Sequence, residues 1–291
     1  MDKDIQKVVD ALIQENVVAI VLGGSNCIGL STISSDIDIC VYYEGVVDIQ
    51  QLNESLSQID DENKRDILLP LYSWGPWLNS GGVCVVDKKN YDITFRELSF
   101  VEEILSDCIS GNIYSIYNPA YPFGYCTAYL VGEVEACQVL YKSSDKISIL
   151  KKCVQGNHNH ICDVIAHFYI EAAIFQCVCG IKQDEKRDRL YKNAQLQNCA
   201  FSLLSTYAAR SSVLLLHNKN AAKRLLKSEK AKAVIGECNL RFLFQIINLE
   251  INDVNSAYTI LGKLIMEEAD KIVLQLNTPA NYEMLRYLLN L

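Results

Sequence analysis

Two different patterns of apolar and polar positions occur in the first hundred residues. Apolar residues at positions 5, 8, 9, 12 and 13 recur with the spacing of one helix face and predict an amphipathic helix over residues 3–15. A second helix is predicted over residues 52–59. Short runs that are rich in β-branched residues and bounded by turn residues predict strands. These runs lie at residues 17–22, 38–43, 83–86 and 91–95.

The pattern changes along the rest of the chain. From residue 99 the spacing is helical, apart from an irregular break over residues 117–124. After residue 150 strand signals and prolines become rare, and four long stretches show helical periodicity. These predicted helices cover residues 161–180, 187–217, 221–235 and 253–275. We therefore predict an α/β (α+β) domain over residues 1–152 and a helical domain over residues 153–291, which suits a chain of this length.

Composition and charge narrow the class of partner. Half of the 291 residues are apolar, so both domains can bury a core. The formal net charge is −8. An acidic surface repels nucleic-acid phosphates and attracts small cationic molecules. These observations argue against a nucleic-acid substrate and favour a small molecule.

The cysteines and the N-terminus predict a cytoplasmic protein. The twelve cysteines are scattered, mostly inside apolar runs, where free thiols behave as small hydrophobic groups. Their spacing gives no zinc motif, although His158 and His160 lie near Cys153 and Cys162. The N-terminus is charged and helical, unlike a signal peptide. No apolar run approaches the roughly 18–20 residues of a membrane span, so no membrane partner is expected.

The first candidate for chemistry is the turn Gly23-Gly24-Ser25, which follows the strand predicted over residues 17–22. Glycine lets the backbone turn tightly and brings amide groups close to a ligand. Amides at the start of a following helix would point at an anion, and the Ser25 hydroxyl could donate to a phosphate oxygen. Taken alone, this tripeptide could equally be an ordinary turn.

The second candidate is a set of three aspartates on predicted strands. Asp36 and Asp38 are two residues apart, so their side chains point to one face of a strand. Paired carboxylates repel each other unless a cation lies between them, and such oxygen ligands suit Mg²⁺. Asp92, on a later strand, would complete a site for two metal ions. The aspartate pair alone could lie on a solvated strand face, and Asp92 alone could be a surface acid. Their combination with the glycine turn favours a site for phosphate and metal ions.

These residues resemble the DNA-polymerase-beta-like nucleotidyltransferase superfamily. The matching pattern is a Gly-Ser pair, an Asp-x-Asp about ten residues later, and a distal Asp on a strand. It is matched by Gly24, Ser25, Asp36, Asp38 and Asp92, and the intervening Gly29 and Ser35 also match its bacterial small-molecule branch. A looser likeness to the lincosamide and aminoglycoside nucleotidyltransferases involves residues 73–77, 81–82, 92–98, 122–125, 132–133 and 187–191.

The resemblance implies a mixed sheet that carries the site and a C-terminal helical bundle that binds the substrate. It implies that Asp36, Asp38 and Asp92 hold two Mg²⁺ ions, with ATP or another nucleoside triphosphate as co-substrate. Gly24, Ser25 and Ser35 would bind the nucleotide phosphates. The reaction would transfer a nucleoside monophosphate to a hydroxyl and release pyrophosphate.

Other residues have weaker functional interpretations. Glu133, expected near the start of a helix, is a candidate general base, because some relatives use an acid outside the metal triad; Asp92 is the alternative base. The remaining residues have structural interpretations that are at least as strong as a role in binding. The binding roles considered are stacking by Trp74 and Trp77, phosphate binding by Arg96 and substrate contacts by Arg187 and Asp188. The basic run at residues 219–232 is considered as a contact for polyphosphate or RNA.

Three functions remain open at this point. The first is nucleotidyl transfer to a small hydroxylated molecule, such as an aminoglycoside or lincosamide antibiotic, which would confer antibiotic resistance. The second is nucleotidylation of a protein or tRNA in a toxin–antitoxin-type system. The third is a non-catalytic nucleotide-binding regulator that keeps the fold. The sequence does not define the oligomeric state.

Overall fold

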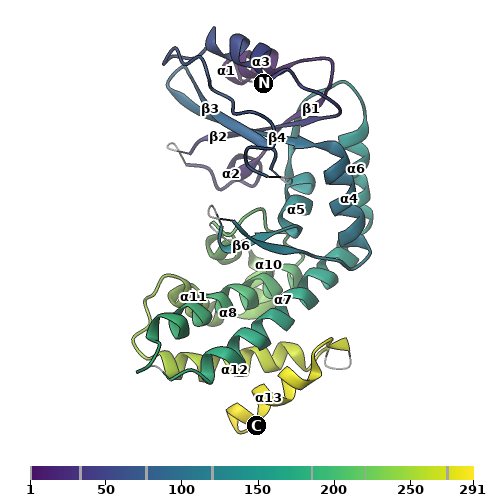
Figure 1. The fold of residues 1–291 in the computed structure, drawn as a ribbon. Helices are drawn as coiled ribbons and strands as arrows, with labels where there is room; N and C mark the ends of the chain where they lie inside the picture. Colours follow the sequence, from purple (N-terminus) through teal and green to yellow (C-terminus); the bar gives the residue numbers. More distant parts are fainter. Residues whose placement is uncertain are drawn as a thin grey trace. The chain divides into compact units, whose positions relative to one another are not determined.

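The computed structural model describes residues 2–32, 35–75, 78–118, 121–184, 186–219, 221–272 and 275–291. The chain forms two compact units (Figure 1). The first comprises Met1–Ser110 and Leu130–Asn157, and the second comprises Gly111–Tyr129 and His158–Leu291. This division falls later than the predicted boundary between residues 152 and 153, because helix α6 (Lys146–Gly156) continues through that position and contacts strand β1 (Val17–Leu22).

The first unit is built on a five-stranded mixed sheet with the strand order β3-β4-β2-β1-β7. Strands β2 and β4 are parallel, and the other neighbouring strands are antiparallel. The bounds are β2 (Ile37–Tyr43), β3 (Ser80–Val86), β4 (Lys89–Glu97) and β7 (Gln138–Lys142). The mixed sheet confirms the predicted α/β class. Its parallel pair places the two strands that carry aspartates side by side.

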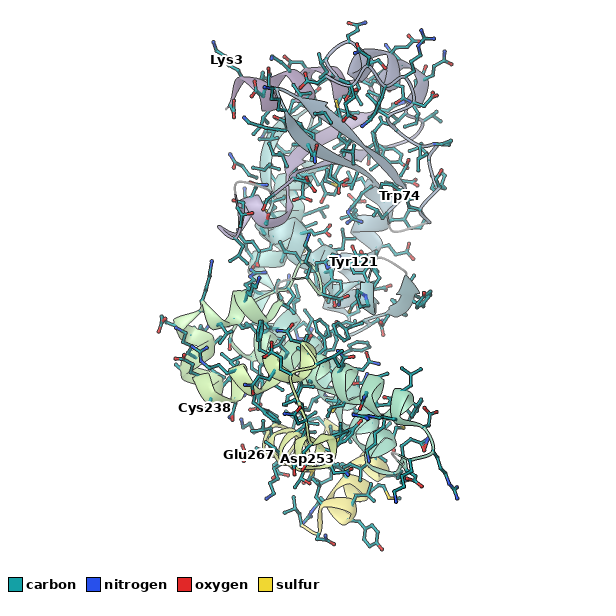
Figure 2. The ribbon with its side chains drawn as sticks, turned by 90° about the vertical axis from the view of Figure 1, so that its left-hand side faces the viewer. Lys3, Trp74, Tyr121, Cys238, Asp253 and Glu267 are labelled. Atoms are coloured by element: carbon teal, nitrogen blue, oxygen red, sulfur yellow. The ribbon has the colours of Figure 1, made fainter. Side chains whose placement is uncertain are left out.

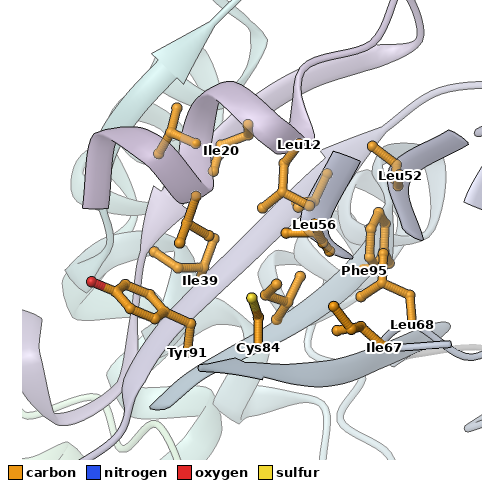
Figure 3. Close-up of a cluster of buried hydrophobic side chains, with 14 of the residues drawn as sticks. Leu12, Ile20, Ile39, Leu52, Leu56, Ile67, Leu68, Cys84, Tyr91 and Phe95 are labelled. Atoms are coloured by element: carbon orange, nitrogen blue, oxygen red, sulfur yellow. The ribbon is translucent and has the colours of Figure 1, made fainter. Parts of the chain in front are cut away.

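One face of this sheet is covered by helices α1 (Lys3–Leu12) and α3 (Ile49–Ser57) (Figure 3). Leu12 of α1 and Leu56 of α3 are fully buried in one cluster with Ile39 of β2 and Ile93 of β4. Side chains of a strand alternate between its two faces. Because the odd-numbered apolar residues of β2 and β4 fill this core, the even-numbered residues of both strands lie on the opposite face.

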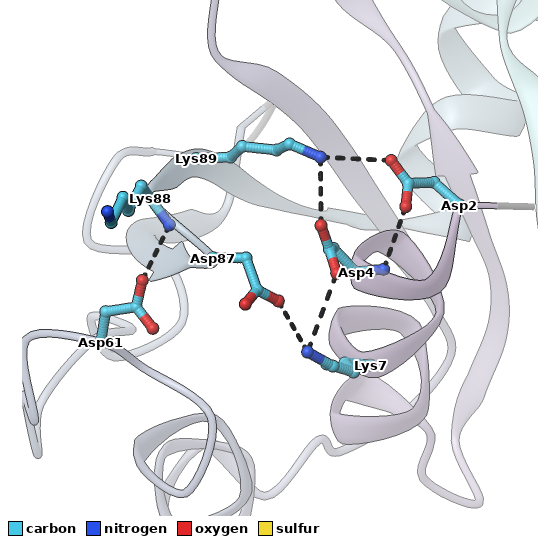
Figure 4. Close-up of polar contacts among 7 residues, drawn as sticks. All are labelled: Asp2, Asp4, Lys7, Asp61, Asp87, Lys88 and Lys89. Carbon is cyan, nitrogen blue, oxygen red and sulfur yellow. Dashed lines mark hydrogen bonds and ion pairs between the residues drawn. The ribbon is translucent and has the colours of Figure 1, made fainter.

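A tight turn joins β3 to β4. Asp87 and Lys88 both have a positive φ, 48° and 63°, as in the two-residue turns that suit twisted hairpins. Lys7 of α1 pairs with Asp87 at 2.6 Å, and Lys89 pairs with Asp4 at 3.1 Å (Figure 4). Exposed pairs of this type contribute little to stability, because solvent screens them. They nevertheless link the N-terminal helix to the start of β4.

Three strands were not predicted from the sequence. β7 is short and pairs only with β1, so its pattern is weak. The break predicted over residues 117–124 is wrong for the described residues, which belong to β5 (Ser115–Asn118) and β6 (Tyr121–Cys126), an antiparallel pair in the second unit. Pro122 and the left-handed Gly124, with φ 79°, interrupt the usual strand pattern. Pro119 and Ala120 lie outside the described residues.

The first unit contains three further helices, and the rest of the second unit is helical. The first unit has α2 (Gly24–Cys27), α4 (Leu98–Ile109) and most of α5 (Ala128–Ala136). The second has α7 (His158–Ile181), α8 (Arg189–Arg210), α9 (Ala221–Leu226), α10 (Glu229–Ile235), α11 (Glu237–Ile247), α12 (Val254–Ala269) and α13 (Pro279–Leu289). The predicted helical bundle is thus confirmed, and α11 and α13 were missed.

Several helix ends differ from the prediction for local reasons. The helix expected over residues 187–217 ends at Arg210, because Ser212 adopts a left-handed φ of 56°. The helix expected over residues 221–235 is two helices, because the Ser228 side chain accepts a hydrogen bond from the Ala231 amide and caps a new helix there.

Helix α7 corrects one expectation about apolar runs. Among the described residues, it is long and apolar enough to cross a membrane by length and composition. Half of its most apolar stretch is buried inside the fold, where the helix contacts α8, α12 and α13. A core helix of a soluble protein meets the same criterion, so α7 is weak evidence for a membrane span.

Candidate active site

The glycine turn lies where β1 ends and α2 begins, next to β2. The Gly23 amide donates to the Asp38 carbonyl oxygen at 2.8 Å. Gly24 has a φ of 57°, and a Cβ atom added there would lie 1.8 Å from Asp38 Oδ2. No residue with a side chain fits at that position without moving the carboxylate. The turn therefore requires glycine because its backbone lies directly against the Asp38 side chain.

Asp38 and Asp92 are neighbours across the parallel strands. They are register partners in the β2–β4 pair, and both lie on the sheet face opposite the α1–α3 core. Directly paired side chains on adjacent strands lie within about 5 Å of each other at Cβ. Two carboxylates from distant parts of the chain thus lie side by side, close to the Gly24 backbone.

Asp36 lies just before β2 and is exposed. Its carboxylate accepts a hydrogen bond from Asn90 Nδ2 at 3.1 Å, and its carbonyl oxygen accepts one from Asn26 Nδ2 at 3.1 Å. These two asparagines hold Asp36 between the glycine turn and the start of β4. The structure therefore brings Asp36 to the same end of the sheet as Asp38 and Asp92.

The two serines proposed as nucleotide ligands have different surroundings. Ser25 is half-buried within α2, and its carbonyl oxygen accepts from the Leu30 amide at 3.1 Å. The Ser35 hydroxyl accepts from the Thr32 amide at 2.9 Å and lies 3.0 Å from the Thr32 hydroxyl. Ser35 thus closes the loop that precedes Asp36. Both assignments as nucleotide ligands stay predictions.

Glu133 lies inside α5 rather than at the start of a helix as expected. Its Oε2 accepts from Arg96 Nη2 at 2.5 Å, and the Arg96 side chain is almost fully buried. Burial raises the pKa of Glu133, the Arg96 charge opposes this shift, and the charge of Asp38 adds to it. The charges of Arg96 and Asp38 therefore act on the Glu133 carboxylate in opposite directions. A raised pKa suits a group that takes up a proton.

The residues present fit Mg²⁺ in their chemistry. Asp36, Asp38 and Asp92 offer carboxylate oxygens, and Mg²⁺ is usually held by one or two carboxylates together with substrate phosphates. Within the part of the chain that the structure describes, no group of three carboxylate, imidazole or thiol side chains forms a ready-made metal site. The Asp38–Asp92 pair therefore supplies a partial site, to which a nucleotide would contribute the remaining oxygen ligands.

The weaker candidates have structural surroundings. Trp74, labelled in Figure 2, is partly exposed, and a Cβ added at Gly81 would lie 2.4 Å from its ring, so the ring packs on the β3 backbone. Trp77 lies outside the described residues, as does Pro76. Arg187 is exposed and lies 3.7 Å from Asp184, while the Asp188 side chain caps α8. These contacts give Trp74, Arg187 and Asp188 ordinary structural roles.

The basic run at residues 219–232 and the cysteines also have ordinary surroundings. Lys232 pairs with Glu229 at 2.7 Å, and Lys230 donates to the Ser212 hydroxyl at 2.7 Å. No disulfide joins the twelve cysteines, all of which the structure describes, and eight of them are buried. His158 Nε2 lies 3.5 Å from Cys162 Sγ, one helical turn away.

Sequence reasoning missed Asn26 and Asn90. Asn90, Asp92, Thr94 and Arg96 occupy alternate positions of β4, and the residues between them fill the core. This period-two pattern of polar residues is visible in the sequence and marks the functional face of the strand. Asn26 gives no such signal, because its bond to Asp36 depends on how the turn folds back.

Comparisons with known proteins bear on this geometry. Residues 5–107 match the family model described as nucleotidyltransferase domain. No match was found among curated proteins. A nucleotidyltransferase-like protein from Exiguobacterium sibiricum is 8% identical, with a TM-score of 0.45, and the match covers 94% of this chain and 75% of that one. An aminoglycoside 6-adenyltransferase from Bacillus subtilis is 10% identical, with a TM-score of 0.27, over 97% and 95% of the two chains. Both TM-scores are below 0.5, so the domain match alone carries weight.

Proposed function

We propose that this chain, whose residues 5–107 match a nucleotidyltransferase domain, transfers a nucleoside monophosphate from ATP or another nucleoside triphosphate to a hydroxyl of a small molecule. Pyrophosphate is the second product. The observation that carries the proposal is the register of Asp38 with Asp92, next to a glycine turn whose backbone lies against the Asp38 side chain. This arrangement brings two carboxylates next to a stretch of backbone that phosphates can approach closely.

The residues have separate roles in the proposed reaction. Asp36, Asp38 and Asp92 would hold Mg²⁺, which supplies charge stabilisation at the transferred phosphate and lowers the pKa of the attacking hydroxyl. Gly24 and Ser25 bind the outer phosphates through the backbone amide and the hydroxyl. Glu133 accepts the proton of the attacking hydroxyl.

Arg96 affects the transfer of this proton to Glu133. It holds the Glu133 carboxylate at a fixed position by a 2.5 Å contact, which limits the rotamers from which the base can act. The same contact favours the charged form of Glu133, whereas burial and Asp38 favour the neutral form. The balance keeps the carboxylate available as a base while raising its proton affinity.

The proposed acceptor is a hydroxylated small molecule, with aminoglycosides and lincosamides as the first classes to test. The net charge of −8 supports a cationic acceptor, since an acidic protein raises the encounter rate with cations. The twelve free thiols favour a reducing cytoplasmic location. Modification of a protein or tRNA instead would assign the enzyme to the toxin–antitoxin-type function.

The test uses purified protein, each nucleoside triphosphate, Mg²⁺ and an acceptor panel of drugs, tRNA and proteins. Pyrophosphate release and an acceptor mass shift are measured together. Asp38→Asn and Asp92→Asn should each lower turnover by at least about 10²-fold, because each removes a negative metal ligand. Asp66→Asn changes an exposed aspartate of the same unit and serves as the matched control. Near-normal turnover in either site variant would refute the metal assignment.

A further inference from the structure

A cavity of about 200 Å³ lies within the second unit, among helices α8, α9 and α11. Its walls combine two aromatic rings, small side chains and three polar residues. The residues that matter for its chemistry are Phe201, Phe244, Ala222, Asn218 and Lys223. A dry engineered cavity of about 150 Å³ can hold benzene, so this volume accommodates one substituted ring. Lys223 belongs to the basic run at residues 219–232, and no residue predicted to bind metal or nucleotide or to act as the base lines the cavity.

Asn218, one of the residues that line the cavity, has a side-chain oxygen without a hydrogen-bond partner. The residue is 9% exposed, and its Nδ2 donates to the Tyr129 hydroxyl at 2.5 Å. Its Oδ1 is buried and has no hydrogen-bond partner. Tyr129 also accepts from the Tyr169 hydroxyl at 3.4 Å, which fixes the side-chain amide. A buried acceptor without a partner is costly, and a ligand with an O–H or N–H donor would remove that cost.

The aromatic wall favours a flat ligand. Phe201 is buried and stacks on Phe123, with ring centroids 4.5 Å apart and an interplanar angle of 6°. Phe244 is partly buried on the other side, and Ala221 and Ala222 leave room between the helices. Phe123 holds the Phe201 ring in place, so the wall is rigid. Aromatic side chains bind aromatic rings through stacked or edge-on contacts.

Lys223 supplies a positive charge at the rim. Its side chain is exposed, and it makes no ion pair with any other described residue. No aspartate or glutamate lines the cavity along its described walls. An anionic substituent on the ligand would therefore meet an uncompensated cation at the opening.

We propose that this cavity binds a small aromatic anion whose ring carries an O–H or N–H donor. The donor bonds to Asn218 Oδ1, the ring lies against Phe201 and Phe244, and the anionic group lies near Lys223. Its binding is tested without any nucleoside triphosphate, so that the result does not depend on the proposed nucleotidyl transfer.

The probes are 3-hydroxybenzoate and 4-hydroxybenzoate, their methoxy counterparts without the donor, and phenol without the anionic group. Binding to the full chain is measured by calorimetry and by ligand-observed NMR. At least one hydroxybenzoate should bind with a Kd of roughly 1 mM or lower. Its methoxy counterpart should bind about tenfold more weakly, because the Asn218 acceptor then stays unsatisfied. Equal binding of the pair, or no binding at about 10 mM, would overturn the proposal.

Two variants and one control locate the site. Ala222→Leu fills the cavity and should abolish binding. Lys223→Gln should weaken hydroxybenzoate binding several-fold and leave phenol binding unchanged, and it changes an exposed side chain that the fold does not need. Lys227→Gln alters the next exposed lysine of this segment, outside the cavity lining, and should have no effect. Wild-type binding by a folded Ala222→Leu protein, or equal effects of both lysine variants, would place the ligand elsewhere.

Discussion

Gly24→Ala should damage the active site more than it damages the fold. The residue has a φ of 57°, a conformation that costs a residue with a side chain about 1–2 kcal/mol. The new Cβ would lie 1.8 Å from Asp38 Oδ2 and 2.3 Å from Asp38 Cγ. An ordinary contact is about 3.5 Å, so the carboxylate must move by roughly 1.5 Å.

Gly29→Ala is a matched control for this change. Gly29 has a φ of 66°, so alanine there meets a similar backbone cost, but no atom lies within 4 Å of the added Cβ. Both variants should lose about 1–2 kcal/mol of stability from backbone strain. Gly24→Ala should lose about another 1 kcal/mol, because the Asp38 side chain is forced from its rotamer.

Turnover should separate the two variants more strongly than stability does. A displacement of about 1 Å at a reacting group can cost 10²-fold in rate, so Gly24→Ala should lose at least that factor. Gly29→Ala should stay within a few-fold of wild type. The assay combines pyrophosphate release at saturating substrate with urea unfolding. Equal losses of turnover in the two variants would show that the contact between Gly24 and Asp38 does not support the chemistry.

Three further predictions test the site and the fold. Activity should require Mg²⁺ or Mn²⁺ and not recover with Zn²⁺, because the proposed ligands are carboxylates; full turnover after EDTA treatment would contradict this. Glu133→Gln keeps an acceptor for Arg96 but removes the base, so kcat should fall about 10²-fold; an unchanged kcat would leave Asp92 as the base. Burial and the charge of Lys219 lower the pKa of His217 to about 4 from 6.5, so its contribution to stability is present above pH 6.5 and lost as the pH falls toward 4. Wild type should therefore lose about 2 kcal/mol of unfolding free energy between pH 7 and pH 5 that His217→Phe does not lose, and equal losses in the two proteins, measured by urea unfolding, would refute this.

The sequence was sufficient for features that depend on neighbouring residues. Helical spacing predicted α1 and α3, and β-rich runs predicted β1 to β4, because periodicity is a local property of the chain. The glycine turn and the Asp36-x-Asp38 spacing were also visible, since both lie within one short segment. The weak strands β5, β6 and β7 escaped detection because they are short and pair with few neighbours.

The contacts between distant segments were decided only by the tertiary structure. The alignment of Asp38 with Asp92 depends on the parallel register of two strands, and a shift of one residue would turn one of them to the other face. The ion pair of Arg96 with Glu133 joins β4 to a helix 37 residues later. The sequence predicted that Asp92 joins Asp36 and Asp38 in one site, but the register of the strands and the Arg96–Glu133 contact depend on the packing of whole elements.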